Sequence, residues 1–296
     1  MKQKRFEGWD DKAFDIINTI LCILVFLIVL YPLIFIVSAS FSDPLAIVTG
    51  RVVLFPVDFN IESYISVFRH PLVGIGYRNT LILMVVGTSI NVFLTVITAY
   101  PLSRNELYGR NAIMLFFTFT MFMSGGLIPT FIVVRNLGLF NTMWAMILPS
   151  AISMFNVIVT RTFFKSNIPD SLVESAYIDG ASNTLILVKI VLPMSKAVVA
   201  VIVLFYGVAH WNQFFLALIY IRDRELWTLQ LVLREILLLA QIMDMAEEGI
   251  GFDRQVLQAE GIRYALIIVA SLPVLVIYPF IQKYFVKGVM IGAIKG

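Results

Sequence analysis

The sequence predicts an all-α membrane protein with six transmembrane helices. Hydrophobic residues make up 59% of the 296 residues and charged residues 14%, whereas soluble domains are about a quarter charged. Six apolar segments each reach the roughly 20 residues that a helix needs to cross a bilayer. These runs are too long and too continuously apolar for the strands of a membrane barrel, so helices are expected. The predicted spans are 16–41, 79–101, 112–134, 142–164, 197–221 and 262–285.

The first span follows a charged N-terminus and contains Ser38-Ala39-Ser40, a weak match to a signal-peptidase site. Its apolar run greatly exceeds the roughly 7–15 residues of a signal peptide, so we expect it to be retained. The other five spans are separated by loops, of which 42–78 and 222–261 are long and 135–141 is short. We find no internal repeat and expect one domain over residues 1–296.

Basic residues predict the orientation, because they accumulate in cytoplasmic loops. With both termini inside, the inside segments hold 13 of the 22 basic residues, including every lysine. These residues are Lys2, Lys4, Arg5, Lys12, Arg104, Arg110, Arg161, Lys165, Lys189, Lys196, Lys283, Lys287 and Lys295. Both termini are therefore expected in the cytoplasm. In the outside loop 222–261, residues 229–245 have helical apolar spacing and predict an amphipathic or re-entrant helix.

The loop 165–196 is the one sizeable inside loop, and its first part has the pattern of a short helix. Asn167 and Pro169 signal a helix start, and Asp170 and Glu174 place negative charge near it. Apolar residues recur at helical spacing through Leu172, Val173, Ala176 and Tyr177. Such a stripe suits a groove on a partner protein. It is equally typical of a loop helix that lies on its own bundle.

The second part of the loop predicts a turn and another short helix. Gly180 is expected to end the first helix in a left-handed conformation. Ser182 has the side chain of a helix N-cap. Pro193 is expected to end or kink the second helix before the fifth span.

The segment ESAYIDGASNTLILVKIVLP closely resembles the cytoplasmic coupling motif of bacterial ABC-importer permeases, which reads EAA, three residues, G, nine residues, I, one residue, LP. Ser175 replaces the first alanine of that motif and keeps the side chain small. The resemblance implies that the loop contacts an ATPase subunit. The residues so implied are Glu174, Ser175, Ala176, Tyr177, Asp179, Gly180, Ile190, Leu192 and Pro193.

Other segments resemble a narrower group, the carbohydrate-uptake permeases related to the smaller maltose permease subunit. These segments are Ser124 to Pro129, Trp211-Asn212-Gln213-Phe214 and the glycine-ended tail 287–296. They look most like the permeases for complex oligosaccharides. The resemblance implies an importer in the bacterial cytoplasmic membrane made of two different permeases, two ATPases and an external sugar-binding lipoprotein. ATP and magnesium would be bound by the ATPases, and this chain would hold no cofactor.

Several other classes of function are not favoured by the residues. No phosphate-binding G-x-x-x-x-G-K-[ST] motif occurs, so ATP hydrolysis by this chain is not expected. No Cys/His cluster has zinc-ligand spacing, and Cys22 is the only cysteine. A formal net charge of +3 does not suggest nucleic-acid binding. No nucleophile and base converge in the sequence, which argues against a membrane enzyme.

The span interiors offer uncharged hydrogen-bonding groups, as a neutral sugar requires. Tyr206, His210 and Gln213 share one face of the fifth span, with Trp211 and Asn212 beside them. Ser150, Ser153 and Asn156 on the fourth span, and Asn91 and Thr95 on the second, are further candidates. The alternative role is to join neighbouring helices, which such side chains commonly do. Prolines 129, 149, 273 and 279 are expected to break or kink their spans.

The residues together favour the permease subunit of an ATP-driven oligosaccharide importer that works by alternating access. A permease for a peptide, an amino acid or phosphate remains an alternative. A proton- or sodium-coupled carrier is a second one, although acidic residues and lysines, which usually form ion relays, are absent from the span interiors.

Overall fold

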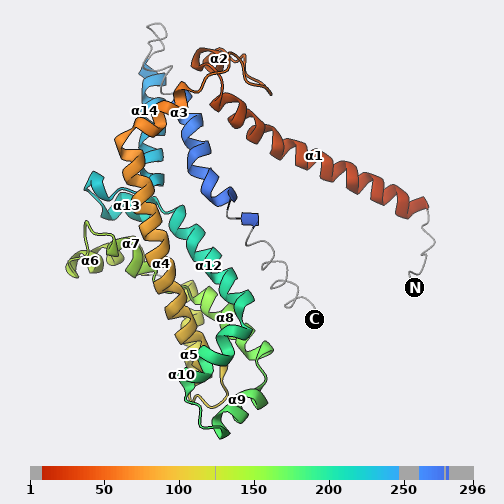
Figure 1. Cartoon of the computed structure of the whole chain (residues 1–296), viewed down its shortest axis with the longest axis vertical. Coiled ribbons are helices and arrows are strands. Elements are labelled where there is room, and N and C mark those ends of the chain that lie inside the picture. The colour runs from red at the N-terminus through yellow and green to blue at the C-terminus, as the bar shows by residue number, and fades with distance from the viewer. Residues whose placement is uncertain (1–8, 124, 247–259, 277, 280–296) are drawn as a thin grey trace. The chain divides into compact units, whose positions relative to one another are not determined.

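The computed structural model describes residues 9–123, 125–246, 260–276 and 278–279, and all regular structure within them is helical (Figure 1). The all-α class is therefore confirmed. The α-helices are α1 (Trp9–Ser40), α2 (Pro44–Val48), α3 (Glu62–Arg69), α4 (Pro71–Ser103), α5 (Arg110–Phe122), α6 (Leu127–Asn136), α7 (Trp144–Ile147), α8 (Met154–Asn167), α9 (Asp170–Ile178), α10 (Asn183–Ile186), α11 (Leu192–Met194), α12 (Lys196–Trp211), α13 (Phe215–Tyr220) and α14 (Leu229–Ala246). Residues 260–276 form a further helix. Two 3₁₀ turns, Leu148–Ser150 and Arg224–Leu226, and one π-helical turn, Leu187–Val191, complete the elements.

Two of the described helices can cross a membrane by length and composition, Lys12–Ser40 within α1 and Pro71–Ser103. The number rises to five if each of three bent helix pairs counts as one span. The sixth predicted span, 262–285, lies partly outside the described residues. The number of crossings and the side on which the termini lie stay predictions.

The contacts within the chain divide it into two units. The first comprises the described parts of residues 1–70 and 235–270, and the second those of 71–234 and 271–296. In the first unit, Ala39 and Ala46 are fully buried beside the Phe35–Tyr264 ring pair. The Tyr64 hydroxyl donates to Ser40 Oγ at 2.8 Å. These contacts join the end of α1 to α2, to α3 and to the helix over residues 260–276.

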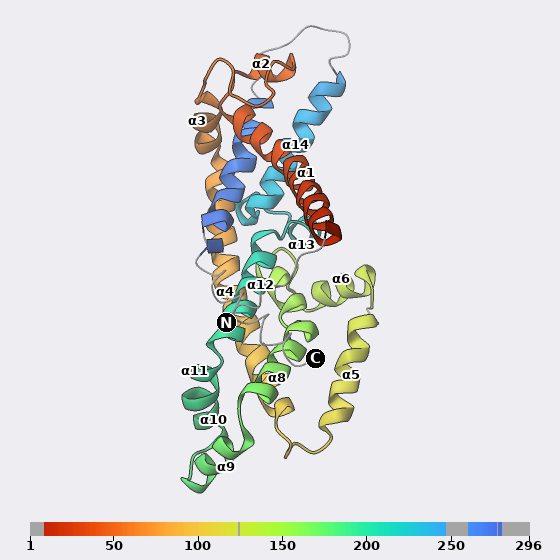
Figure 2. The same cartoon turned by 90° about the vertical axis from the view of Figure 1, so that its right-hand side faces the viewer.

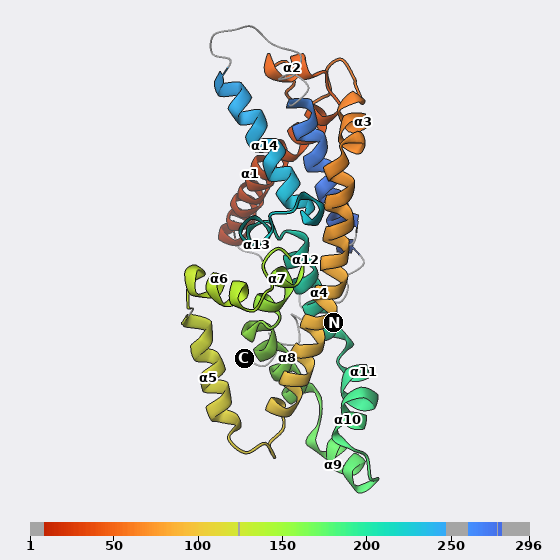
Figure 3. The ribbon, with the colours of Figure 1, turned by 90° about the vertical axis from the view of Figure 1, so that its left-hand side faces the viewer.

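The second unit is built around α4, which runs beside α8 and α12 (Figures 1 and 3). Its buried face combines large apolar residues with small and polar ones, including Gly87, Asn91 and Thr95, and the small residues let neighbouring helices approach closely. The helix begins at Pro71, whose fixed φ suits the first helical position. We predicted this span to begin near 79. The stretch Gly74-Ile75-Gly76 therefore lies in a helix and not in a loop.

Three of the predicted spans are not continuous helices. The third is replaced by α5 and α6, and α6 begins after Gly126, whose φ is +82°. The fourth is broken around Pro149, and the helix axis bends by 52° between its two parts. The predicted fifth span ends as α12 at Trp211 and resumes as α13, without a proline at the break. The helix predicted over 229–245 is confirmed as α14, and its amphipathic or re-entrant placement at the membrane stays a prediction.

Candidate functional site

The loop 165–196 folds as short helices at one end of the second unit (Figure 2). α9 begins after Pro169, as predicted, and Gly180 follows its end with φ +81°. The Gly180 amide donates to Tyr177 O at 3.0 Å, and the Ala181 amide donates to Ala176 O at 2.9 Å. This pair of bonds is a Schellman cap, which needs a left-handed residue at position 180. The predicted glycine cap is confirmed.

The second half of the loop also follows the predicted signals. The Ser182 hydroxyl accepts a hydrogen bond from the Leu185 amide at 3.3 Å and caps α10. A π-helical turn and Pro193 follow, and residues 183–194 meet α12 at 85°. Proline has no amide hydrogen to donate and clashes with the preceding turn, where the π-helical turn lies, whereas the 85° bend follows Pro193, at Ser195. Pro193 itself is exposed, whereas Ile190 and Leu192 are half-buried on the same unit.

Two residues of the apolar stripe of α9 face its own bundle, whereas Leu172 is half-buried and Tyr177 is exposed. Val173 and Ala176 are buried against Tyr100 of α4, Phe164 of α8 and Ile186 of α10. Val173 and Ala176 therefore do not reach a groove on a partner, as the alternative of a helix lying on its own bundle has it. Contact of the loop with an ATPase stays a prediction. These two residues pack within the chain because α4 and α8 end beside them.

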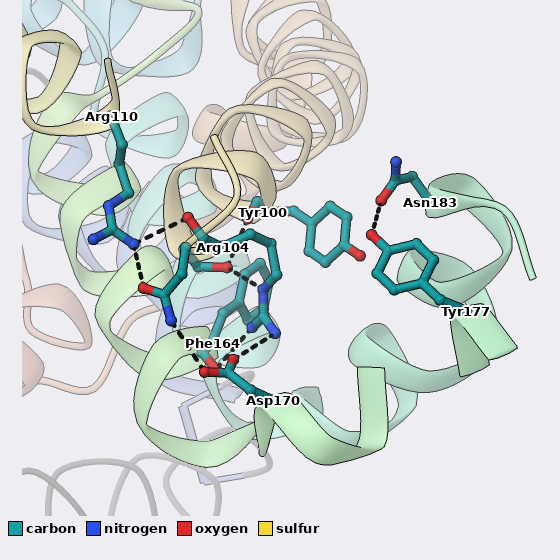
Figure 4. A network of polar contacts seen from close by, with 9 residues as sticks. Tyr100, Arg104, Arg110, Phe164, Asp170, Tyr177 and Asn183 are labelled. Carbon is teal, nitrogen blue, oxygen red and sulfur yellow. Dashed lines mark hydrogen bonds and ion pairs between the residues drawn. The ribbon is translucent and has the colours of Figure 1, made fainter. Parts of the chain in front are cut away.

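The opposite face of α9 is free in the described structure. Glu174, Ser175, Asp179 and Gly180 are exposed, and open space surrounds the place of a side chain at Gly180. Ile178 is 87% exposed, more than the 39% of Tyr177. The Tyr177 hydroxyl is hydrogen-bonded to the Asn183 side chain, which ties α9 to α10 (Figure 4).

Most of the predicted substrate-path residues line one cavity of about 260 Å³ between the break before α8, α8 itself and the end of α12. Its lining residues are Ser150, Ser153, Asn156, Phe205, Tyr206, Ala209, His210 and Gln213. A larger groove of about 990 Å³ beside it is lined mostly by apolar side chains, and Asn156 and Trp211 are among its lining residues. Only the smaller cavity gathers the donors and acceptors that sugar hydroxyls require.

Tyr206 and His210 are held by contacts to α4. The Tyr206 hydroxyl lies 2.7 Å from Thr95 Oγ1 and accepts from the Ser153 amide at 3.0 Å. His210 Nε2 lies 2.7 Å from Asn91 Oδ1. These are helix-joining contacts, the role that the sequence left open as the alternative. Both side chains nevertheless border the cavity.

Amide side chains bond to the backbone at two helix breaks beside this cavity, the break before α8 and the break after α12. Asn91 Nδ2 donates to Ser150 O at 2.8 Å and to Ala151 O at 2.7 Å, at the break before α8. Gln213 follows α12, donates to Met146 O at 3.0 Å and lies 3.2 Å from His210 Nδ1 through Oε1. The carbonyls freed where the helices break are thereby satisfied by amide side chains.

Asn156 differs from its neighbours in the cavity. It is 5% exposed, yet within the described residues no hydrogen bond of its carboxamide is found. Trp211 and Asn212 do not line the cavity. Trp211 is buried and packs edge-on against Tyr77 with ring centroids 6.0 Å apart. Asn212 is exposed and donates to Val208 O of its own helix.

The chain matches no protein-family model. It is 40% identical over 288 residues to the polygalacturonan/rhamnogalacturonan transport system permease protein YtcP of Bacillus subtilis, which covers 97% of this chain and 99% of that protein. It is also 40% identical to protein LplC of the same organism, over 96% of each chain. The chain belongs to the ABC-importer permeases of the carbohydrate-uptake family.

A solved structure of a bacterial ABC transporter involved in the import of the acidic polysaccharide alginate shares the fold of this permease. The match has a TM-score of 0.85 and 32% identity, and it covers 95% of this chain and all of that chain. The family resemblance seen in the motifs is thereby confirmed over nearly the whole permease.

Two residues of this permease's site were missed by the sequence reasoning. Gly87 of α4 lies against the His210 ring, a contact across 123 positions of the chain that no local pattern shows. Ile178 is the exposed apolar residue on the outer side of α9. Its place just off the buried stripe was a readable signal, because an apolar residue there cannot join the packed face.

Proposed function

We propose that this chain is the permease subunit of an ATP-driven importer that moves an oligosaccharide into the cytoplasm. The observation that carries the proposal is that one continuous helix, α4, connects the loop helix α9 with residues of the polar cavity. α4 contacts the buried side of the loop helix α9 through Tyr100. Its Asn91 and Thr95 contact two residues that line the polar cavity, His210 and Tyr206. A movement imposed on α9 can therefore reach the residues that line the cavity through a single continuous helix, as alternating access requires.

The substrate that we propose is an oligosaccharide. The cavity presents hydroxyl, amide and imidazole groups, and none of its eight lining residues is an acid, a lysine or an arginine. Such groups pair with sugar hydroxyls. YtcP is named for polygalacturonan and rhamnogalacturonan, and the matched structure belongs to an alginate importer. Acidic oligosaccharides therefore belong in the test beside neutral ones, with their carboxylates recognised outside this cavity.

The remaining parts of the importer are proposed from the family. A second, different permease completes the pathway, two ATPase subunits bind ATP and magnesium, and an external lipoprotein delivers the sugar. The exposed face of α9, with Glu174, Ser175, Ile178 and Gly180, is the surface that we propose for an ATPase. Residues 1–296 would form one domain in the bacterial cytoplasmic membrane, with both termini and this loop inside, as the lysines predict.

Co-purification tests this proposal. The chain is tagged, expressed with the genes beside its own, and purified in mild detergent, and ATP hydrolysis is measured with the candidate binding protein and one oligosaccharide at a time. We expect an ATPase and a second permease to copurify, and one class of sugar to stimulate hydrolysis. A chain that purifies without an ATPase and that takes up solute along a proton or sodium gradient contradicts the proposal.

A further inference from the structure

The buried side of α9 is fixed to the end of α4 by a charged contact as well as by apolar packing (Figure 4). Arg104 follows α4, and its side chain is 6% exposed. Its Nη1 lies 3.5 Å from Asp170 Oδ1, and its Nη2 donates to Phe164 O, in the last turn of α8, at 3.4 Å. The guanidinium also lies over the Tyr100 ring, 5.7 Å from its centroid.

Asp170 is the first residue of α9 and receives two partners from consecutive residues after α4. Oδ1 faces Arg104, and Oδ2 accepts from Asn105 Nδ2 at 3.1 Å. A carboxylate is also favoured at a helix N-terminus by the helix dipole. Arg104 is buried while Asp170 remains half-exposed, so removing the acid leaves a buried cation without its charged partner, which is the costly half of such a pair.

The contact extends to α5. Arg110, the first residue of α5, donates from Nη1 to Arg104 O at 3.0 Å and to Asn105 Oδ1 at 2.7 Å. The ends of α4 and α8 and the starts of α5 and α9 therefore meet in one hydrogen-bonded group, defined here as the anchor: Arg104, Asn105, Arg110 and Asp170. Asn105 and Asp170 lie 65 positions apart in the sequence. Their hydrogen bond is therefore a tertiary contact between α9 and the residues after α4, and not a consequence of the two helices being neighbours in the chain.

The anchor connects to residues that line the polar cavity through continuous helix, which has Pro101 inside it. From Arg104 back to Asn91 the chain is helical up to Ser103, which at about 1.5 Å per residue spans roughly 20 Å. Thr95 contacts Tyr206 and Asn91 contacts His210 along the same stretch. A displacement of the anchor therefore moves these cavity contacts together.

We infer that Asp170, held by Arg104 and Asn105, is a positioning residue through which movement of α9 is transferred to α4 and so to the sugar cavity. This inference rests on the proposed function. The outer face of α9 would receive the ATPase movement. The apolar stripe fills the space between α9 and the bundle, and the anchor fixes the direction in which α9 can move relative to α4.

The experiment compares Asp170→Asn, Asp170→Glu and Glu106→Gln in the whole complex reconstituted in liposomes. Glu106 is an exposed acid in the loop after α4 and is the matched control for losing one carboxylate. Asp170→Asn keeps the size of the side chain and loses its charge, whereas Asp170→Glu keeps the charge. The readouts are ATPase co-purification, the melting temperature of the complex, sugar-stimulated ATP hydrolysis, and sugar imported per ATP hydrolysed.

We expect Asp170→Asn to copurify with its ATPases and to lose about fivefold or more of the sugar stimulation and of the sugar imported per ATP. Asp170→Glu should recover part of the loss, and Glu106→Gln should match wild type. The inference is overturned if Asp170→Asn equals Glu106→Gln, or if it lowers only the melting temperature and the yield, as a merely structural residue would. A wild-type complex that neither copurifies with an ATPase nor imports sugar overturns the proposed function instead.

Discussion

The imidazole of His210 lies directly against Gly87, so that a β-carbon at residue 87 would be 2.5 Å from His210 Nε2. Glycine at this position therefore permits the bond between His210 and Asn91. That bond in turn holds the helix breaks that surround the cavity. Gly87 thus leaves the space in which the polar contacts between α4 and His210 form.

Gly87→Ala is expected to displace His210, because ring atoms cannot approach a methyl group at that distance. Uptake should fall and the complex should melt at a lower temperature, since a buried unpaired group costs about 1–3 kcal/mol. Gly74→Ala is the matched control, because Gly74 lies in the same helix with open space at its β-position. Equal uptake and melting temperature in the two variants would contradict the packing described here.

Asn156→Ala should mainly change the KM for sugar, whereas His210→Ala should mainly change the melting temperature of the complex. Asn156 borders the cavity without a hydrogen bond of its carboxamide in the described structure, so its loss should raise the KM for sugar about two- to tenfold with little effect on melting temperature. His210 joins two helices, so its loss should lower the melting temperature first. Uptake kinetics and thermal unfolding of each complex test this, and a destabilised Asn156→Ala with unchanged KM would reverse the assignment.

Gly180→Arg is expected to abolish import while the external binding protein still captures sugar. The substitution adds bulk to the exposed face of α9 and places a side chain at φ +81°, which costs about 1–2 kcal/mol. Gly138→Arg carries the same strain, with φ +70° and open space, in the predicted outside turn. Uptake by Gly138→Arg should remain, which separates strain from lost docking. Wild-type uptake by a well-expressed Gly180→Arg would exclude the docking role.

Ile178→Ser is expected to weaken ATPase binding. Burying an isoleucine in an interface contributes about 1.5–3 kcal/mol, so the affinity should fall roughly ten- to a hundredfold. Tyr108, which is 98% exposed in the loop between α4 and α5, supplies the control Tyr108→Ser. Titration of the purified ATPase against each permease in nanodiscs measures both. Equal affinities would show that Ile178 lies outside the interface.

Local signals in the sequence predicted local structure well. Pro169, Gly180 and Ser182 lie at the helix limits that their chemistry favours, and α14 covers the segment whose apolar spacing predicted it. Each of these features depends on residues within one or two helical turns, so a single sequence contains the information.

Features that depend on distant packing were not predictable. The break after α12 has no proline and is held by Gln213 bonding to Met146, 67 positions away. Which side of α9 is buried depended on where α4 and α8 end. Hydropathy is averaged over a window of residues and does not detect such breaks, because a broken span has the same composition as a straight one.

The most direct test of the central claim is sugar uptake by the complete complex in liposomes, with ATP enclosed with the ATPases and the binding protein supplied on the opposite side. We predict uptake of one class of oligosaccharide that requires ATP, persists without an ion gradient and is lost with Gly180→Arg. Uptake that continues without ATP and follows a proton or sodium gradient would contradict the account.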